Sequence, residues 1–274
     1  MKKIINFILS SFIVICFTSC EMFMIDNYDE PDQTLWGEII DKGTGQRMLT
    51  DQGSEGVRIR LLELSWSDTP EPFDFWCMKE GIFQNTKVFA GYYNVQVDGP
   101  FIPLIRRNSQ GELLADESWY DYIKGGTTKI RFEVEPFLRL EWVGEPVVTE
   151  DRRIQCSFKV TRGVSEEVFR QKIEPMGGWN NNFTEVANLY LFVSESPSCG
   201  YREGRNYGWD TAEPAFSGNA FETKYGFGNT ITLTSNVIPA GRTVFVRNGA
   251  RIRYSTLSVQ RSNYNEIKRV DIPR

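Results

Sequence analysis

The stretch Val57-Arg58-Ile59-Arg60-Leu61 alternates apolar and charged residues without interruption. Successive side chains of a β-strand point to opposite faces, so the three apolar residues would be buried while the arginines face away from the core. The same period of two recurs at Tyr93, Val95 and Val97. Strands of this kind bury one face of each sheet, as in an antiparallel β-sandwich.

Further strands are predicted along the whole chain, and no long helical period interrupts them. They are expected at 35–41, 81–88, 130–135, 138–143, 153–161, 187–194, 230–234, 242–248 and 251–259. One short helix is predicted at 166–174, although no clear capping box supports it. We therefore predict an all-β protein with two consecutive antiparallel β-sandwich domains of Ig-like or transthyretin-like type, at 34–136 and 137–274.

The N-terminus has the order of a secretory signal. Lys2 and Lys3 precede an apolar run at 4–17, and Thr18 and Ser19 then lead to Cys20. The run is shorter than the roughly 20 apolar residues that a transmembrane helix needs. Phe17-Thr18-Ser19-Cys20 resembles the lipobox of bacterial lipoproteins, which implies a signal peptide at 1–19 and a lipid on Cys20. The alternative is an ordinary signal with a chance cysteine at its cleavage site.

The segment that follows, 20–33, contains acidic residues and no basic ones. We interpret it as a solvated tether between the lipid and the first domain. It also resembles the acidic stretch after the cysteine in Bacteroidetes lipoproteins that reach the cell surface. The predicted location is therefore the outer membrane, with the chain held by its N-terminal lipid and facing the cell exterior.

Composition excludes several classes of function. The chain has no histidine, which removes Ser-His-Asp and Cys-His catalysis and every metal site that needs imidazole. The net charge is −5 without a basic block, which argues against nucleic acid as a partner. The acidic residues lack the spacing of a calcium loop, so neither a metal nor a cofactor is predicted.

Three cysteines follow Cys20, and an odd number cannot form a complete disulfide framework. A bridge between Cys156 and Cys199 is one interpretation, since the predicted compartment permits disulfides. The other is that Cys156, on the apolar face of an alternating strand, packs as a small hydrophobic residue.

Two resemblances extend this interpretation. Gly37-Glu38-Ile39-Ile40-Asp41 with Gly56-Val57-Arg58-Ile59, and Gly81-Ile82-Phe83-Gln84 with Ala90-Gly91-Tyr92-Tyr93-Asn94-Val95, resemble carboxypeptidase-regulatory-like (transthyretin-like) domains over roughly 35–136. Such domains are structural or binding modules, and they imply a small seven-stranded sandwich.

The whole chain resembles a family of two-sandwich Bacteroidetes lipoproteins of unassigned function. The lipobox, the domain order and the C-terminal stretch from Val244 to Pro273 carry this resemblance. It implies association with outer-membrane glycan-uptake systems of the SusC/SusD type. The family has no established catalytic residues that could be transferred to this chain.

Aromatic residues beside polar ones are the candidate binding sites. Sugar rings stack their CH faces on Trp and Tyr, while nearby amides and charged groups bind the hydroxyls. The candidates for carbohydrate binding lie in the long connections and are Trp119, Tyr122, Trp179, Asn180, Tyr207 and Trp209. Alternatively, these aromatics cover the ends of the sandwiches or form the contact between domains.

Two functions follow from this sequence. The first is a non-catalytic surface lipoprotein that binds a polysaccharide or oligosaccharide as an accessory of an uptake system. The alternative is a structural module that docks on an outer-membrane protein and touches no glycan. Glycoside hydrolysis would need a pair of carboxylates across a cleft, and no recognised motif supplies one, so an enzyme ranks last.

Overall fold

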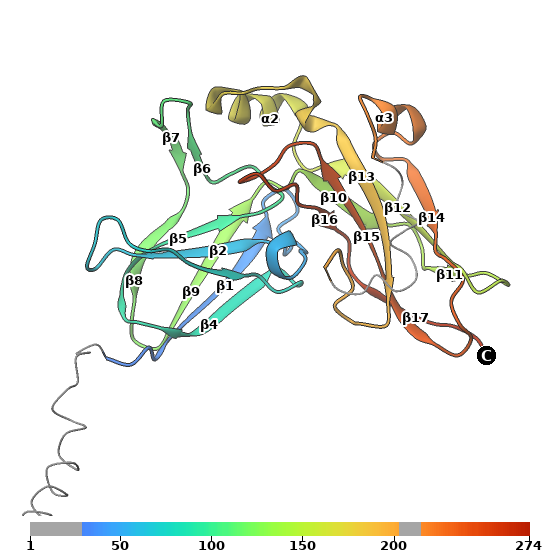
Figure 1. Cartoon of the computed structure of the whole chain (residues 1–274), viewed down its shortest axis with the longest axis horizontal. Coiled ribbons are helices and arrows are strands. Elements are labelled where there is room, and N and C mark those ends of the chain that lie inside the picture. The colour runs from blue at the N-terminus through green and yellow to red at the C-terminus, as the bar shows by residue number, and fades with distance from the viewer. Residues whose placement is uncertain (1–28, 203–214) are drawn as a thin grey trace, which may run out of the picture.

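The computed structural model describes residues 29–202 and 215–274, and it shows two β-rich units side by side (Figure 1). In the first unit a three-stranded sheet contains β4 (Ile82–Val88), β1 (Gln33–Asp41) and β9 (Thr127–Val134), in that order. A four-stranded sheet contains β3 (Phe73–Trp76), β2 (Arg58–Glu63), β5 (Gly91–Asp98) and β8 (Trp119–Ile123).

The core of the first unit lies between these two sheets. Ile59 and Val95 from the four-stranded sheet and Phe83 and Phe132 from the three-stranded sheet belong to one buried cluster. The alternation in β2 is confirmed, because Ile59 is fully buried while Arg58 and Arg60 are partly exposed. The chain is thus mostly β, with several antiparallel sheets.

One pairing departs from the antiparallel arrangement. β1 runs parallel to β9 along eight residues, from Thr34 opposite Thr127 to Asp41 opposite Val134. Parallel neighbours need a long connection between them. Here the rest of the first unit provides it, so the first and last strands of the unit lie side by side in the three-stranded sheet.

The connection at 99–126, one of the long connections of the first unit, contains three strands that were not predicted. It forms a two-stranded hairpin of β6 (Ile105–Arg107) and β7 (Leu113–Asp116), followed by β8. The hairpin rises from the first unit toward the helices of the second unit (Figure 1). Its strands are too short to show a clear alternation, which is why the sequence did not reveal them.

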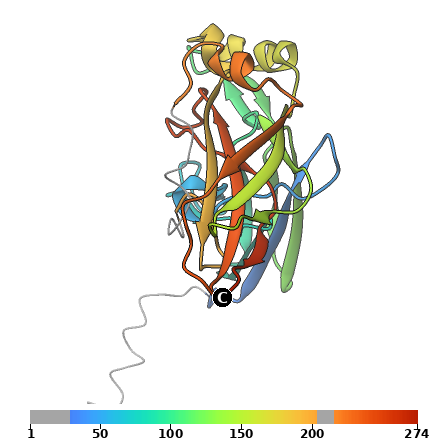
Figure 2. The same ribbon diagram turned by 90° about the vertical axis from the view of Figure 1, so that its right-hand side faces the viewer.

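The second unit also has two sheets. One contains β10 (Leu138–Trp142), β12 (Ile154–Arg162), β11 (Val147–Val148) and β14 (Thr230–Thr234). The other contains β13 (Val186–Ser194), β15 (Thr243–Ile252), β16 (Asn263–Tyr264) and β17 (Lys268–Asp271). Figure 2 shows the second unit turned toward the viewer, with its helices gathered at one end.

One strand prediction in this unit is wrong. The separate strands expected at 242–248 and 251–259 are a single strand, β15, and 253–259 forms a loop. Gly249 lies in the middle of β15, where an added Cβ would come within 3.0 Å of Tyr264 and 3.1 Å of Phe192. This glycine lets two rings pack against the strand and does not mark a turn.

The predicted helix is confirmed as α2 (Glu166–Ile173). Ser165 caps it by accepting a hydrogen bond from the Val168 amide at 3.2 Å. Residue 168 is valine, so the reciprocal half of a capping box is missing. A second short helix, α3 (Ala220–Lys224), packs Phe221 into the core. No helix within 29–202 or 215–274 is long and apolar enough to cross a membrane.

The three cysteines of the body are free and buried. Cys156 packs in the core of the second unit, as one of the two interpretations of the sequence proposed. Burial raises the pKa of the Cys156 thiol to about 12, so it behaves as a small apolar group at neutral pH.

The two units meet through buried polar groups. Arg247 of β15 is 1% exposed and donates from Nη1 to the Thr50 carbonyl of the first unit at 2.9 Å. Arg261 donates from Nη1 to Asp98 Oδ2 at 2.7 Å.

Asp51 of the first unit accepts hydrogen bonds from the Tyr201 amide and the Tyr264 hydroxyl. Groups of this kind fix the relative position of the units, because a shift that broke a contact without exposing it to water would leave a polar group buried and unpaired.

A further pair crosses the interface at its edge. Arg139 of β10 binds both carboxylate oxygens of Asp41, at 2.5 Å from Nε and 2.7 Å from Nη2. Burial raises the pKa of Asp41, but hydrogen bonds from Arg139 and from the Gly43 amide outweigh it and leave the pKa below its ordinary value.

We predict that Asp41→Asn lowers the free energy of unfolding by about 1–2 kcal/mol at pH 7, since the arginine loses its charged partner. A lowered carboxyl pKa stabilises the folded state above the unfolded-state pKa, and this contribution is lost as pH falls through the folded-state pKa. The difference between wild type and variant should therefore shrink from about pH 5 toward about pH 2. Denaturant titrations measure it, with Glu150→Gln, at an exposed residue after β11, as the control. A difference independent of pH would contradict the assignment.

Candidate functional site

The outer face of the sheet β3-β2-β5-β8 carries polar and aromatic side chains. Cross-strand register places Arg58 opposite both Trp76 and Asp98, and Arg60 opposite Asp74 and Gln96. Farther along the same face Asn94 pairs with Tyr120, and Tyr92 pairs with Tyr122. These residues share a face because they alternate with the apolar residues that form the core.

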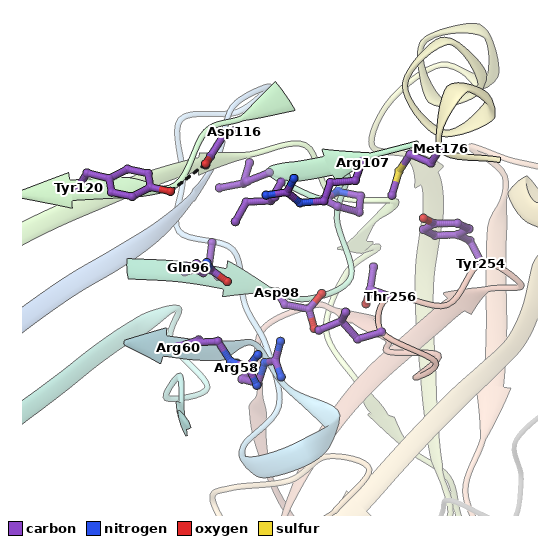
Figure 3. A pocket seen from close by; sticks show the side chains of 15 residues that line it. Arg58, Arg60, Gln96, Asp98, Arg107, Asp116, Tyr120, Met176, Tyr254 and Thr256 are labelled. Carbon is purple, nitrogen blue, oxygen red and sulfur yellow. Dashed lines mark hydrogen bonds between the residues drawn. The ribbon is translucent and has the colours of Figure 1, made fainter. Parts of the chain in front are cut away.

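One end of this face is covered by other elements, and a cavity of about 340 Å³ lies beneath them. The sheet contributes Arg58, Arg60, Gln96 and Asp98, and the β6–β7 hairpin contributes Arg107 and Asp116. The second unit supplies Met176, Tyr254, Thr256 and Leu257. In the view of Figure 3, Arg107 lies on one side of the cavity and Arg58 and Arg60 on the other. The cleft therefore exists only because the two units are held together.

Two arginines share one carboxylate at the floor of the cleft. Arg60 binds Asp74 through both oxygens, at 2.7 and 2.8 Å, while Arg58 Nη1 lies 3.4 Å from Asp74 Oδ2. The Arg60 hydrogen bond holds the pKa of Asp74 below its ordinary value. The Nε of Arg58 is buried and has no hydrogen-bond partner among the described residues.

Asp98 lies at the boundary between the cleft and the interface. Its carboxylate is paired with Arg261, whose side chain is 3% exposed. Burial raises the pKa of Asp98, against the opposing effect of Arg261 and Arg58. Asp98 thereby links the position of the second unit to the floor of the cleft.

The open side of the cleft continues into a row of tyrosines. Tyr120 is 48% exposed and donates from its hydroxyl to Asp116 Oδ2 at 3.0 Å. Tyr122 is 53% exposed, and its ring lies 5.1 Å from that of Tyr92. Lys124 Nζ lies 4.7 Å from the centre of the Tyr122 ring. These rings offer flat apolar surface with polar groups at their edges, which is the chemistry of a sugar platform.

A turn with unusual backbone geometry stands at the mouth of the cleft. Thr256 and Val259 bond each other's backbone at 3.1 and 3.0 Å around Leu257 and Ser258, which have φ of 49° and 64°. Two positive φ values are typical of a type I′ turn, for which Asn-Gly is the favoured sequence. Positive φ is unfavourable for residues with a side chain, such as Leu257 and Ser258. The turn nevertheless holds Leu257, which is 60% exposed, over the cleft.

The structure uses Trp179 for packing. Its ring lies 6.2 Å from that of Phe169 and 5.8 Å from that of Phe183, and its Nε1 donates to Asn181 Oδ1. Asn180 is exposed, and its side chain caps the 3-10 helix Asn181–Thr184. This pair does not reach the cleft described above.

The other predicted residues divide into three cases. Trp119 points to the core of the first unit and packs against it, whereas Tyr122, three positions along the same strand, lies on the exposed face. Tyr207, Trp209 and the lipidation residue Cys20 lie outside the described residues.

Comparison with solved structures identifies relatives of this chain. A DUF3823 family protein from Bacteroides uniformis ATCC 8492 shares 48% sequence identity with it, over 89% of this chain and 100% of that one, with a TM-score of 0.83. The chain belongs to the DUF3823 family. No family model matches the sequence, and no curated protein does.

More distant structures share the fold of this DUF3823 chain. A B. uniformis protein described as a "putative carbohydrate binding protein" is 20% identical over 88% of this chain and 100% of its own, with a TM-score of 0.61. A DUF3823 family protein from Parabacteroides merdae ATCC 43184 is 16% identical over the same shares, with a TM-score of 0.58. The two-unit arrangement is therefore common to proteins of widely different sequence.

The cleft residues were missed by sequence reasoning, although a signal was present. Arg58 and Arg60 are the charged members of the alternating stretch, and Gln96 is a polar member of the next one. Alternation predicts that such residues share the exposed face of a sheet. It does not show that Tyr254 and Leu257, about 160 residues later, close that face into a cleft.

We predict that Ser258→Gly raises the free energy of unfolding by about 1 kcal/mol, because glycine adopts positive φ without a steric cost. Ser255→Gly is the matched control. Its backbone is not at positive φ, so glycine there should lower the stability slightly. Thermal and denaturant unfolding measure both variants, and equal effects at the two positions would show that the turn is not strained.

Proposed function

We propose that this DUF3823 protein is a non-catalytic lipoprotein of the outer membrane that binds glycan at the cell surface for a polysaccharide-uptake system. The observation that carries this proposal is the cleft between the units, which continues into exposed tyrosines on the sheet face. The description of one structural relative as a "putative carbohydrate binding protein" supports the same ligand class.

The chemistry of the site suits an extended sugar chain. Tyr120 and Tyr122 offer rings on which the CH faces of successive sugars can stack. Gln96 and the arginines provide hydrogen-bonding groups at the covered end, where the cavity of about 340 Å³ can hold part of an oligosaccharide. The cleft is open at one side, so a long polysaccharide could enter it without first being cut into short pieces.

The alternative function, docking on an outer-membrane protein, has its own supporting observation. Apolar side chains are exposed at the edge of the same sheet, with Trp66 70% exposed and Phe73 53% exposed. Exposed apolar groups on an edge strand are typical of a contact surface. This surface lies at the β3 edge of the sheet, opposite the β8 edge that carries the tyrosines. The binding experiment below separates the two functions.

We predict that Tyr120→Ala and Tyr122→Ala each weaken glycan binding by about 1–3 kcal/mol, by analogy with other stacking contacts. The lipid-free chain from residue 21 onward is titrated against a panel of plant and host polysaccharides by calorimetry. Phe73→Ala is the control, because this exposed ring lies on the core side of the same sheet.

Trp179→Ala distinguishes the two candidate sites in the same titration. Because Trp179 packs in the second unit, its loss should lower the free energy of unfolding and leave glycan affinity unchanged. If Trp179→Ala weakens binding while the tyrosine variants bind normally, the site lies at Trp179 and Asn180. If no polysaccharide binds to the wild type, the docking function replaces the glycan-binding one.

The membrane location is tested at Cys20. Cys20→Ala should abolish labelling with a radioactive fatty acid and release the protein from the membrane fraction. Cys16→Ala, four residues earlier, should change neither result, because bulky Ile15 precedes it. Digestion of the wild type by protease added to intact cells is expected for a surface protein. Fatty-acid labelling that survives Cys20→Ala would contradict the lipobox assignment.

A further inference from the structure

Positive charge is in excess around the cleft between the units. Three arginines line it, Arg58, Arg60 and Arg107, against two aspartates, Asp98 and Asp116. The chain as a whole has the opposite balance, with a net charge of −5. The excess therefore does not follow from the average composition of the surface.

The carboxylates near the cleft are already engaged. Asp98 accepts a hydrogen bond from Arg261 at 2.7 Å, and Asp74 is bound by both oxygens to Arg60. Asp116, at the rim, accepts hydrogen bonds from the amide and hydroxyl of Ser118 and from Tyr120. Each acid is thus held in place by protein donors. Arg58 acts on Asp98, and Arg107 on Asp116, through charge and not through a hydrogen bond among the described residues.

Two arginines retain donors that could meet an incoming anion. Arg58 has one long contact to Asp74, from Nη1 at 3.4 Å, so its guanidinium end is less firmly paired than that of Arg60. The Nε of Arg58 is buried and is not counted among the donors that a ligand could reach. Arg107 is exposed on the hairpin and donates from Nη1 to the Gly111 carbonyl at 3.1 Å. Figure 3 shows these two side chains on opposite sides of the cavity. A group placed between them would be approached by guanidinium donors from both sides.

We propose that the cleft binds a negatively charged sugar, with its carboxylate or sulfate between Arg58 and Arg107; this rests on the proposed glycan-binding function. Planar guanidinium groups match the oxygens of such anions, and hydrogen bonds between charged groups are stronger than those to neutral hydroxyls. The tyrosines would then hold the neighbouring sugars of the chain, while the arginines select chains that carry charge.

The test compares charged polymers with neutral ones of matched backbone. Polygalacturonate is titrated beside its carboxyl-reduced form, and dextran sulfate beside dextran, against the full lipid-free chain. We expect the charged member of at least one pair to bind about tenfold or more tightly than its neutral partner, and added salt to reduce this preference. The pair that shows it identifies carboxylate or sulfate as the anion.

Variants assign the preference to the cleft. Arg107→Gln should weaken binding of the charged polymer about tenfold and leave the neutral one unchanged. Arg131→Gln is the control, since it removes one exposed arginine, 52% exposed, from the opposite sheet. Arg58→Lys retains the positive charge but loses the planar guanidinium, so it should also weaken binding of the charged polymer. Circular dichroism verifies that each variant is folded.

The outcomes are distinct. Equal affinity for charged and neutral partners would overturn this inference and leave the glycan-binding function standing. A charge preference that Arg107→Gln and Arg131→Gln reduce equally would place it on the general surface and overturn the inference as well. No binding to any polymer would overturn the proposed function itself.

Discussion

Two buried arginines connect the halves of this molecule, and the geometry of the cleft depends on them. Arg247 and Arg261 belong to the second unit, and their guanidinium groups end against Thr50, Ser54 and Asp98 of the first. A buried guanidinium that lost these acceptors would remain charged in an apolar surrounding, which costs about 3–5 kcal/mol for a buried pair. A sliding movement that broke these contacts while the groups stayed buried would therefore lower the stability.

This constraint gives the sheet face a cleft that it would not have alone. Arginines at alternate positions of a strand are normally solvated, as at the outer face of many sandwiches. Here the loop containing Tyr254 and Leu257 lies over Arg58 and Arg60 and turns the flat face into a cleft. Asp98 belongs to both the interface and the cleft, because it binds Arg261 in the interface and lines the cleft. The groups that we propose to bind ligand are thus oriented in advance, which would lower the cost of binding.

The local pattern of the sequence was sufficient to predict most strands, because alternation is a property of neighbouring residues. It failed where long-range contacts decide the outcome. The strands expected at 242–248 and 251–259 are one strand, β15, within which Gly249 gives room to Tyr264 and Phe192. The candidate site shows the same division. Tyr122 was predicted as a candidate from its local composition, whereas Arg58 and Tyr254 line one cleft only after the chain has folded.

The most direct measurement is the crystal structure of the lipid-free chain with the oligosaccharide that binds it most tightly. The account predicts sugar rings over Tyr120 and Tyr122, with the end of the chain between Arg58 and Arg107 and in contact with Tyr254. It also predicts that the two units keep the relative position they have without ligand. An oligosaccharide bound beside Trp179 and Asn180, with the interdomain cleft empty, would contradict it.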